Sequence, residues 1–270
     1  MTLRFTILGC GSSGGVPRLP DEWGECDPSN PKNRRRRCSL LVERVGRGGT
    51  TIVLVDTSPD LREQLLGTRT GRLDGVVWTH AHADHVHGID DLRMIYFRTG
   101  TRIPCWADEP TRAALLARFG YAFAAPEGSP YPPICDLRDL SGPVEVDGPG
   151  GPIGVVPFAV DHGATPCLGL RIGGLAYVPD AVAIPDDSWP HLKGLDVLVV
   201  DALRRRPHPT HANLDLALDW IGRARPRRAV LTNMHVDLDH AAVDAETPED
   251  VAPAHDGMTI ELPVPPRWKT

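Results

Sequence analysis

The chain has 270 residues, of which 41% are hydrophobic and 24% are charged, and its formal net charge is −6. This composition is ordinary for a globular protein with a substantial core, and the negative charge argues against a protein that coats nucleic acid through overall basicity. The run Arg34–Arg37 could still help to collect an anionic substrate. The six cysteines form no C-x-x-C pair, and no stretch approaches the ~18–20 apolar residues of a membrane span. We therefore predict a cytoplasmic protein without a membrane segment.

Short apolar runs bounded by glycine predict a first half that is rich in strands. The first strand, Phe5–Gly9, ends in a glycine-rich turn at Gly11–Gly15. A hairpin follows, with strands at Ser39–Val45 and Thr51–Asp56. Further along, we predict a helix at Pro59–Leu66 capped by Ser58, a strand at Gly75–Trp78, and helices at Ile89–Phe97 and Thr111–Phe119.

The second half repeats this pattern. An amphipathic helix is predicted where Leu214, Ala217, Leu218 and Ile221 follow i, i+3, i+4, i+7 spacing. Strands are predicted at Ile153–Val160, Leu168–Ile172, Leu175–Val178, Val197–Val200 and Ala229–Thr232. Two β-rich halves, about 1–140 and 141–270, with helices outside them predict an α/β sandwich that forms a single domain over residues 1–270.

The segment His80-Ala81-His82-Ala83-Asp84-His85 directly follows an apolar strand. Imidazole suits zinc, iron and similar metals, and the carboxylate adds an oxygen donor. His80 and His82 point the same way in an extended backbone, and the turn after them lets Asp84 and His85 converge from another side. A lone histidine is more often a hydrogen-bonded surface or core residue, but four such residues at this spacing predict a metal site.

His-x-His-x-Asp-His after an apolar strand resembles the hallmark of the metallo-β-lactamase superfamily. The opening Phe5–Pro17, FTILGCGSSGGVP, resembles the start of its phosphodiesterase branch. That branch includes the tRNA 3′-processing endonucleases and the phosphoribosyl cyclic phosphodiesterases of the carbon–phosphorus lyase pathway. The resemblance covers nearly the whole chain, and it implies a four-layer αββα sandwich with two divalent metal ions between the sheets.

The same resemblance implies where the remaining ligands lie. His162 and Asp180 occupy the places of a later histidine and a bridging aspartate, and Asp56 that of an aspartate that orients ligand histidines. The last ligand is a histidine near the C-terminus. In many relatives it directly follows a Leu-Thr strand end, where this chain has Asn233, and we expect His235 to take the role because imidazole binds transition metals better than an amide.

Two such metals would activate a bridging hydroxide for attack on phosphorus. We expect zinc or manganese, with iron as a further possibility. Asp84 and Asp180 are expected to act as catalytic residues as well as metal ligands. His211 lies just before the amphipathic helix. It corresponds to a histidine that acts as the general acid in the cyclic phosphodiesterase relatives. The alternative is that His211 is merely exposed in a proline-rich loop. Weaker candidates for substrate binding are Ser13 and Gly14 of the glycine-rich turn and the nearby Arg18.

The sequence thus predicts a dinuclear hydrolase that acts on a small cyclic phosphate or a nucleotide-like phosphodiester. Alternatives are a tRNA 3′-processing endonuclease, for which no long basic arm is evident, a lactone or thioester hydrolase on the same metal site, and a metal-bound module without turnover. A nucleic-acid partner is possible but not favoured, and a homodimer is plausible. The cyclic phosphodiesterase relative also carries a structural zinc on a cysteine cluster, of which only Cys26 is retained here.

Overall fold

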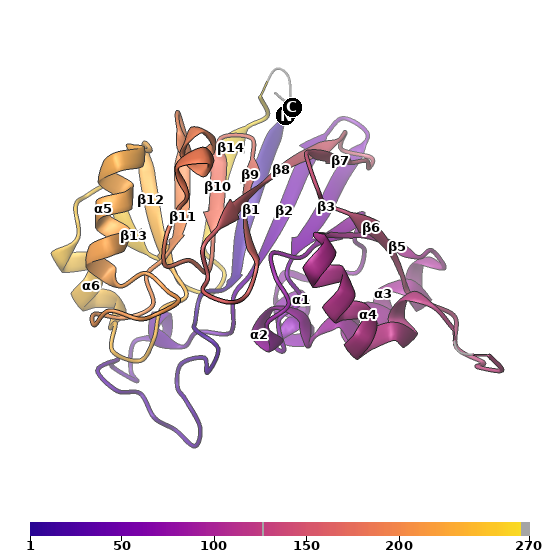
Figure 1. Ribbon diagram of the computed structural model, residues 1–270, viewed down its shortest axis with the longest axis horizontal. Coiled ribbons are helices and arrows are strands. Elements are labelled where there is room, and N and C mark those ends of the chain that lie inside the picture. Colours follow the sequence, from indigo (N-terminus) through magenta and orange to yellow (C-terminus); the bar gives the residue numbers. More distant parts are fainter. Residues whose placement is uncertain (126, 266–270) are drawn as a thin grey trace.

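The computed structural model describes residues 1–125 and 127–265, so residue 126 and the last five residues of the predicted 1–270 domain lie outside the described part. Two seven-stranded sheets stand side by side in the middle of the molecule, with helices on their outer sides (Figure 1). This is the αββα sandwich that the sequence predicts.

The first sheet has the order β14-β1-β2-β3-β4-β5-β6. The pairs from β14 to β3 are antiparallel, and the pairs from β3 to β6 are parallel. Its strands are β1 (Thr2–Gly9), β2 (Ser39–Gly46), β3 (Gly49–Val55), β4 (Gly75–Val77), β5 (Ile103–Ala107), β6 (Cys135–Asp139) and β14 (Thr259–Pro263).

The second sheet has the order β13-β12-β11-β10-β9-β8-β7. Here the pairs from β7 to β10 are antiparallel and those from β10 to β13 are parallel. Its strands are β7 (Val144–Val146), β8 (Ile153–Val160), β9 (Cys167–Ile172), β10 (Leu175–Val178), β11 (Val197–Asp201), β12 (Arg228–Thr232) and β13 (Val251–Pro253).

The alternation of side chains along β2 shows how the layers are held together. Leu40 and Val42 belong to the cluster that fills the space between the sheets, whereas Leu41 packs outward with Leu61 and Ile95 of the helices. The outer helices of the first sheet are α1 (Leu61–Thr68), α3 (Leu92–Thr99) and α4 (Glu109–Phe123), and those of the second are α5 (Leu214–Ala224) and α6 (His240–Glu246). The short α2 (Ala83–Val86) lies within the His-x-His-x-Asp-His segment.

The structure differs from the predicted elements mainly at helix starts and in short strands. Helix α1 begins at Leu61 with Asp60 as its N-cap, because Ser58 instead bonds to Gln64 and to the Asp60 backbone. The predicted helix at 89–97 begins with a 3₁₀ turn, and its α-helical part starts at Leu92. Strands β5, β6, β7, β13 and β14 have no counterpart among the predicted ones. They are only three to five residues long and each contains a proline or a charged residue, whereas the equally short β4 and β10 lie in continuous apolar runs.

Candidate active site

The site lies where strand ends of both sheets meet. Asp56 and His80 follow β3 and β4 of the first sheet, and Asp180 and Asn233 follow the parallel strands β10 and β12 of the second. Parallel strands bring their carboxyl ends to one edge, which explains why residues far apart in sequence converge there. The sheets are linked at this edge, since the Leu168 N–H donates to the Thr79 carbonyl at 3.0 Å.

The first set of possible ligands consists of three imidazoles. One ring nitrogen each from His80, His82 and His162 lies within 4.8 Å of the others. His162 Nδ1 donates to the Thr210 carbonyl at 2.7 Å, so the lone pair of this ring is on Nε2, which lies 3.1 Å from His82 Nδ1. Three imidazoles at this separation could hold a metal ion through nitrogen donors alone.

The second set combines imidazole and carboxylate. His80, His85 and Asp180 form it, and His85 Nε2 lies 2.9 Å from Asp180 Oδ2 and 3.6 Å from Asp84 Oδ2. His80 Nε2, His85 Nε2 and Asp180 Oδ2 are all buried, yet none has a hydrogen-bond partner of suitable geometry. Buried polar atoms are rarely left without a partner, so three converging ones are what a metal position requires. The donor set therefore fits the metals that the sequence predicts.

Asp56 orients two of the histidines in this array. Its carboxylate accepts hydrogen bonds from the Thr79 N–H and hydroxyl, both at 2.8 Å, and from His85 Nδ1 at 2.7 Å. The Thr79 hydroxyl in turn lies 3.0 Å from His80 Nδ1. Asp56 thus fixes the ring of His85 directly and that of His80 through Thr79, and in both rings Nε2 points toward the site.

The electrostatics of the site favour a bound cation. Burial lowers the pKa of His80 well below its usual value, and it also lowers the pKa of His82 and His162, so these rings are neutral. Burial alone would lower the pKa of His85 too, but the Asp180 and Asp56 carboxylates outweigh it and raise that pKa well above its usual value. The carboxylates here therefore hold a positive charge, which a divalent ion could supply in place of a proton.

His211 lies beside the donor sets rather than in an exposed loop position. Its ring centroid is 4.6 Å from that of His162, and its Nδ1 lies 3.3 Å from Asp180 Oδ1. His211 Nδ1 also pairs with Asp201 Oδ2 at 2.9 Å. Burial alone would lower the pKa of His211, but the hydrogen bond to Asp201 reverses this and raises it. His162, Asp180 and His211 also form a third group of possible ligands.

The sequence reasoning missed Asp201. It ends the buried strand β11, is fully buried, and also accepts a hydrogen bond from the Ala181 N–H at 3.1 Å. Burial raises the pKa of Asp201 to about 7, against the opposing hydrogen bond from His211. A signal was available, because the VLVVD strand end repeats the IVLVD pattern that ends in Asp56.

His235, the histidine expected as the last metal ligand, lies outside the sets of possible ligands. His235 belongs to none of the three ligand groups found among the described residues; its Nδ1 pairs with Asp237 Oδ1 at 3.0 Å. Asn233, two residues earlier, lies inside the site, 2.9 Å from Asp180. The backbone explains the difference, since Asn233 adopts a left-handed turn (φ 60°) and the His235 N–H then donates to the Leu203 carbonyl at 2.9 Å.

The glycine-rich turn and Arg18 lie next to this edge. The Ser12 N–H donates to the Met234 carbonyl at 3.4 Å, so the turn runs alongside the Asn233 loop, with Ser13 exposed. Gly14 and Arg18 line a cavity of about 760 Å³, together with the run Arg34–Arg37. The Arg18 side chain covers Gly14, where a Cβ would come within 3.1 Å of Arg18 Nε.

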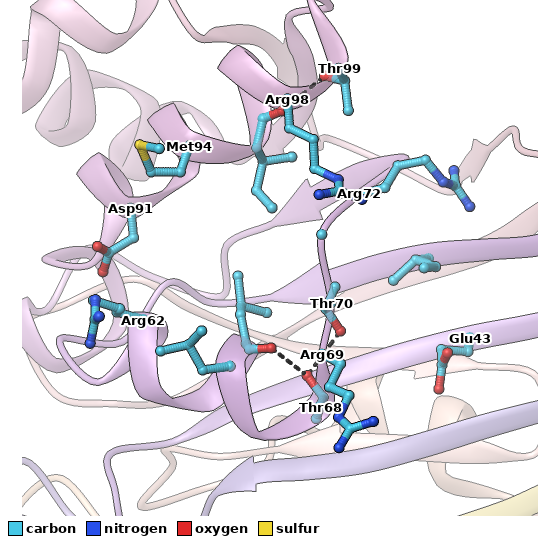
Figure 2. A pocket seen from close by; sticks show the side chains of 15 residues that line it. Glu43, Arg62, Thr68, Arg69, Thr70, Arg72, Asp91, Met94, Arg98 and Thr99 are labelled. Carbon is cyan, nitrogen blue, oxygen red and sulfur yellow. Dashed lines mark hydrogen bonds between the residues drawn. The ribbon is translucent and has the colours of Figure 1, made fainter.

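A different cavity, of about 960 Å³, opens on the outer helical side of the first sheet (Figure 2). Its wall includes Glu43 of β2, Arg62 of α1, and Met94 and Arg98 of α3. No candidate ligand is among the described residues that line it. The candidate site is therefore the donor array at the strand ends, and not this cavity.

Comparison with known proteins identifies the class. Residues 51–234 match the family model of the β-lactamase superfamily domain. The chain therefore belongs to the metallo-β-lactamase superfamily, and with its cluster of possible metal ligands it is a metal-dependent hydrolase.

Individual relatives and solved structures resemble this chain along most of its length. The crystal structure of a diphosphatase from the PhnP family is 35% identical, with a TM-score of 0.87, and the match covers 97% of this chain and 98% of that chain. An octanoyltransferase of Porphyromonas gingivalis is 32% identical over 257 residues, covering 94% of this chain. The chain spans about half the length of that relative (49%). The short form of human tRNase Z is 17% identical with a TM-score of 0.66, covering 97% of this chain and 100% of that chain, and shares the fold.

Within residues 1–125 and 127–265, no helix is both long enough and apolar enough to cross a membrane.

Proposed function

We propose that this chain is a phosphodiesterase that acts on a small cyclic phosphate or a nucleotide-like phosphodiester. The observation that carries the proposal is the His211–Asp201 pair, which lies beside two sets of metal ligands. A metal pair alone suits many hydrolyses, but a buried acid that can protonate an alkoxide suits a substrate with a poor leaving group. The similarity to a PhnP-family diphosphatase supports hydrolysis at phosphorus, which is the part of the chemistry that the proposal shares with that protein.

In this proposal His80, His82 and His162 would hold one divalent ion, and Asp84, His85 and Asp180 would hold the other. Zinc and manganese both suit these donors, and iron is a further possibility. When bound, the ions would supply an activated water and neutralise the oxygens of the phosphoryl group. Asp56 keeps the rings of His80 and His85 in place through the contacts described above.

The remaining residues would handle the substrate and the proton. Asp201 holds Nδ1 of His211, so that the opposite nitrogen, Nε2, would give its proton to the departing oxygen. Ser13, Gly14 and Arg18 are proposed to bind an anionic part of the substrate that does not react. Positive charge at this edge supports that role, because Arg18 lines the same cavity as the run Arg34–Arg37.

The experiment is a turnover assay with the purified chain, loaded with zinc or with manganese. The panel contains ribose cyclic phosphates, 2′,3′-cyclic nucleotides, a linear phosphodiester, precursor tRNA, a lactone and a thioester. We expect turnover of a cyclic phosphate that is lost in Asp180→Ala and after chelation. Turnover confined to the lactone or thioester, or to the tRNA, would refute the proposed substrate class and favour that alternative instead. Silence across the panel with metal bound would favour a non-catalytic module.

A further inference from the structure

Asn233 occupies a central place in the site. It follows β12, is only 2% exposed, and has a left-handed backbone that asparagine tolerates better than most residues. Its side chain points into the space between Asp180, Asp201 and His211. Its amide is therefore the group that closes this side of the second set of metal ligands.

The hydrogen bonds define which end of the amide faces the site. Asn233 Nδ2 lies 2.9 Å from Asp180 Oδ1 and 3.2 Å from Asp201 Oδ1, and it can donate one proton to each carboxylate. His211 Nδ1, also 3.2 Å away, donates to Asp201 and so accepts no proton from this amide. An amide NH₂ group carries protons and no lone pair for a metal. Turning the amide by 180° would break both bonds to the carboxylates and place the carbonyl oxygen against two carboxylate oxygens. The neighbours thus hold Asn233 as a donor, and it is not a ligand.

The two metal positions consequently differ in their donors. His80, His82 and His162 provide three imidazoles, which suit zinc. The second set shares His80 with the first, so its own donors are the imidazole of His85 and the carboxylate of Asp180, with the Asp84 carboxylate nearby. His211 also lies near Asp180, but its Nδ1 is engaged with Asp201. Oxygen donors suit manganese or magnesium better than imidazole does.

We infer that Asn233 makes the two metal positions unequal: a tight zinc position at His80, His82 and His162, and a weaker, exchangeable position at Asp84, His85 and Asp180. Manganese competes with zinc at the weaker position. The inference rests on the metal sites of the proposed function but not on its substrate.

The test measures metal binding to the full-length chain without any substrate. Metal-free wild type, Asn233→His and Asn233→Ala are titrated with zinc against a chromophoric chelator. Metal content is then measured by mass spectrometry after dialysis against zinc with excess manganese. Circular dichroism and melting of each metal-free variant check the fold.

We expect two zinc affinities in the wild type that differ at least tenfold, and a mixed zinc and manganese content after dialysis. Asn233→His adds an imidazole, so the second affinity should rise at least tenfold and manganese should be excluded. Asn233→Ala should leave the second position weak, because it removes the amide without adding a ligand.

Two equal zinc affinities in the wild type would overturn the inference, whether or not Asn233→His folds. An Asn233→Ala variant that tightens the second position as much as Asn233→His would also overturn it. Since neither measurement involves turnover, unequal affinities in a chain that cleaves no phosphodiester would refute the proposed function alone.

Discussion

Removing the acid pair tests the proposed chemistry most directly. His211→Ala deletes the ring that pairs with Asp201 at 2.9 Å, and general acid catalysis typically contributes about 10²–10⁴-fold. Asp201→Asn keeps the ring but weakens its support. The Asp201 carboxylate accepts hydrogen bonds from His211, the Ala181 N–H and Asn233. An asparagine side chain has only one acceptor oxygen, so in either orientation its NH₂ group would face at least one of these donors. Losing one charged hydrogen bond, about 1.5–3 kcal/mol, corresponds to a rate loss of about 10- to 150-fold.

The assay compares two leaving groups on the same phosphodiester. With an alkoxide leaving group, which needs a proton, kcat should fall by these factors. With 4-nitrophenolate, which leaves without one, both variants should stay near the wild-type rate. His208→Ala is the matched control, because its ring lies 5.0 Å from that of His211 on the same loop. Metal content is measured for every variant. An equal loss of kcat on both substrates at full metal content would refute the acid role.

Three further predictions concern metal affinity and stability. Asp56→Asn removes the charge that holds His85 Nδ1 at 2.7 Å, so zinc affinity should fall about 10- to 100-fold in a competition titration, and an unchanged affinity would contradict the support role. Burial, aided by Lys32 and Arg35, lowers the pKa of His240 to about 4, below its usual value of about 6.5. The folded state thus favours the neutral ring, and the wild type should lose stability as the pH falls from about 6.5 to about 4. In urea unfolding experiments, His240→Asn should lose less unfolding free energy than the wild type over this pH range. Equal losses in the two proteins would argue against a contribution from His240. Because β14 from the C-terminal half pairs with β1, residues 1–270 should unfold in one transition by both fluorescence and circular dichroism, whereas two separate transitions would indicate two units.

The sequence alone determined the fold and the densest part of the site. Three histidines and an aspartate within six residues are local, so the turn after β4 places them together whatever the rest of the chain does. Strands could be predicted from the sequence where apolar residues alternate with polar ones or form a continuous run, as in β1, β2 and β8. Five short strands were missed because a proline or a charged residue interrupts each apolar run, and it is pairing with neighbouring strands that makes them strands.

Only the tertiary structure decided which residues complete the site. Asp201 belongs to the site because its carboxylate accepts hydrogen bonds from His211, ten residues later across a loop, and from Asn233, which follows the next strand. The choice between Asn233 and His235 depends on a left-handed turn and on a bond to the Leu203 carbonyl, neither of which is visible in the order of residues. Ligand chemistry favoured the imidazole, but the direction in which a side chain points is set by backbone contacts between distant segments.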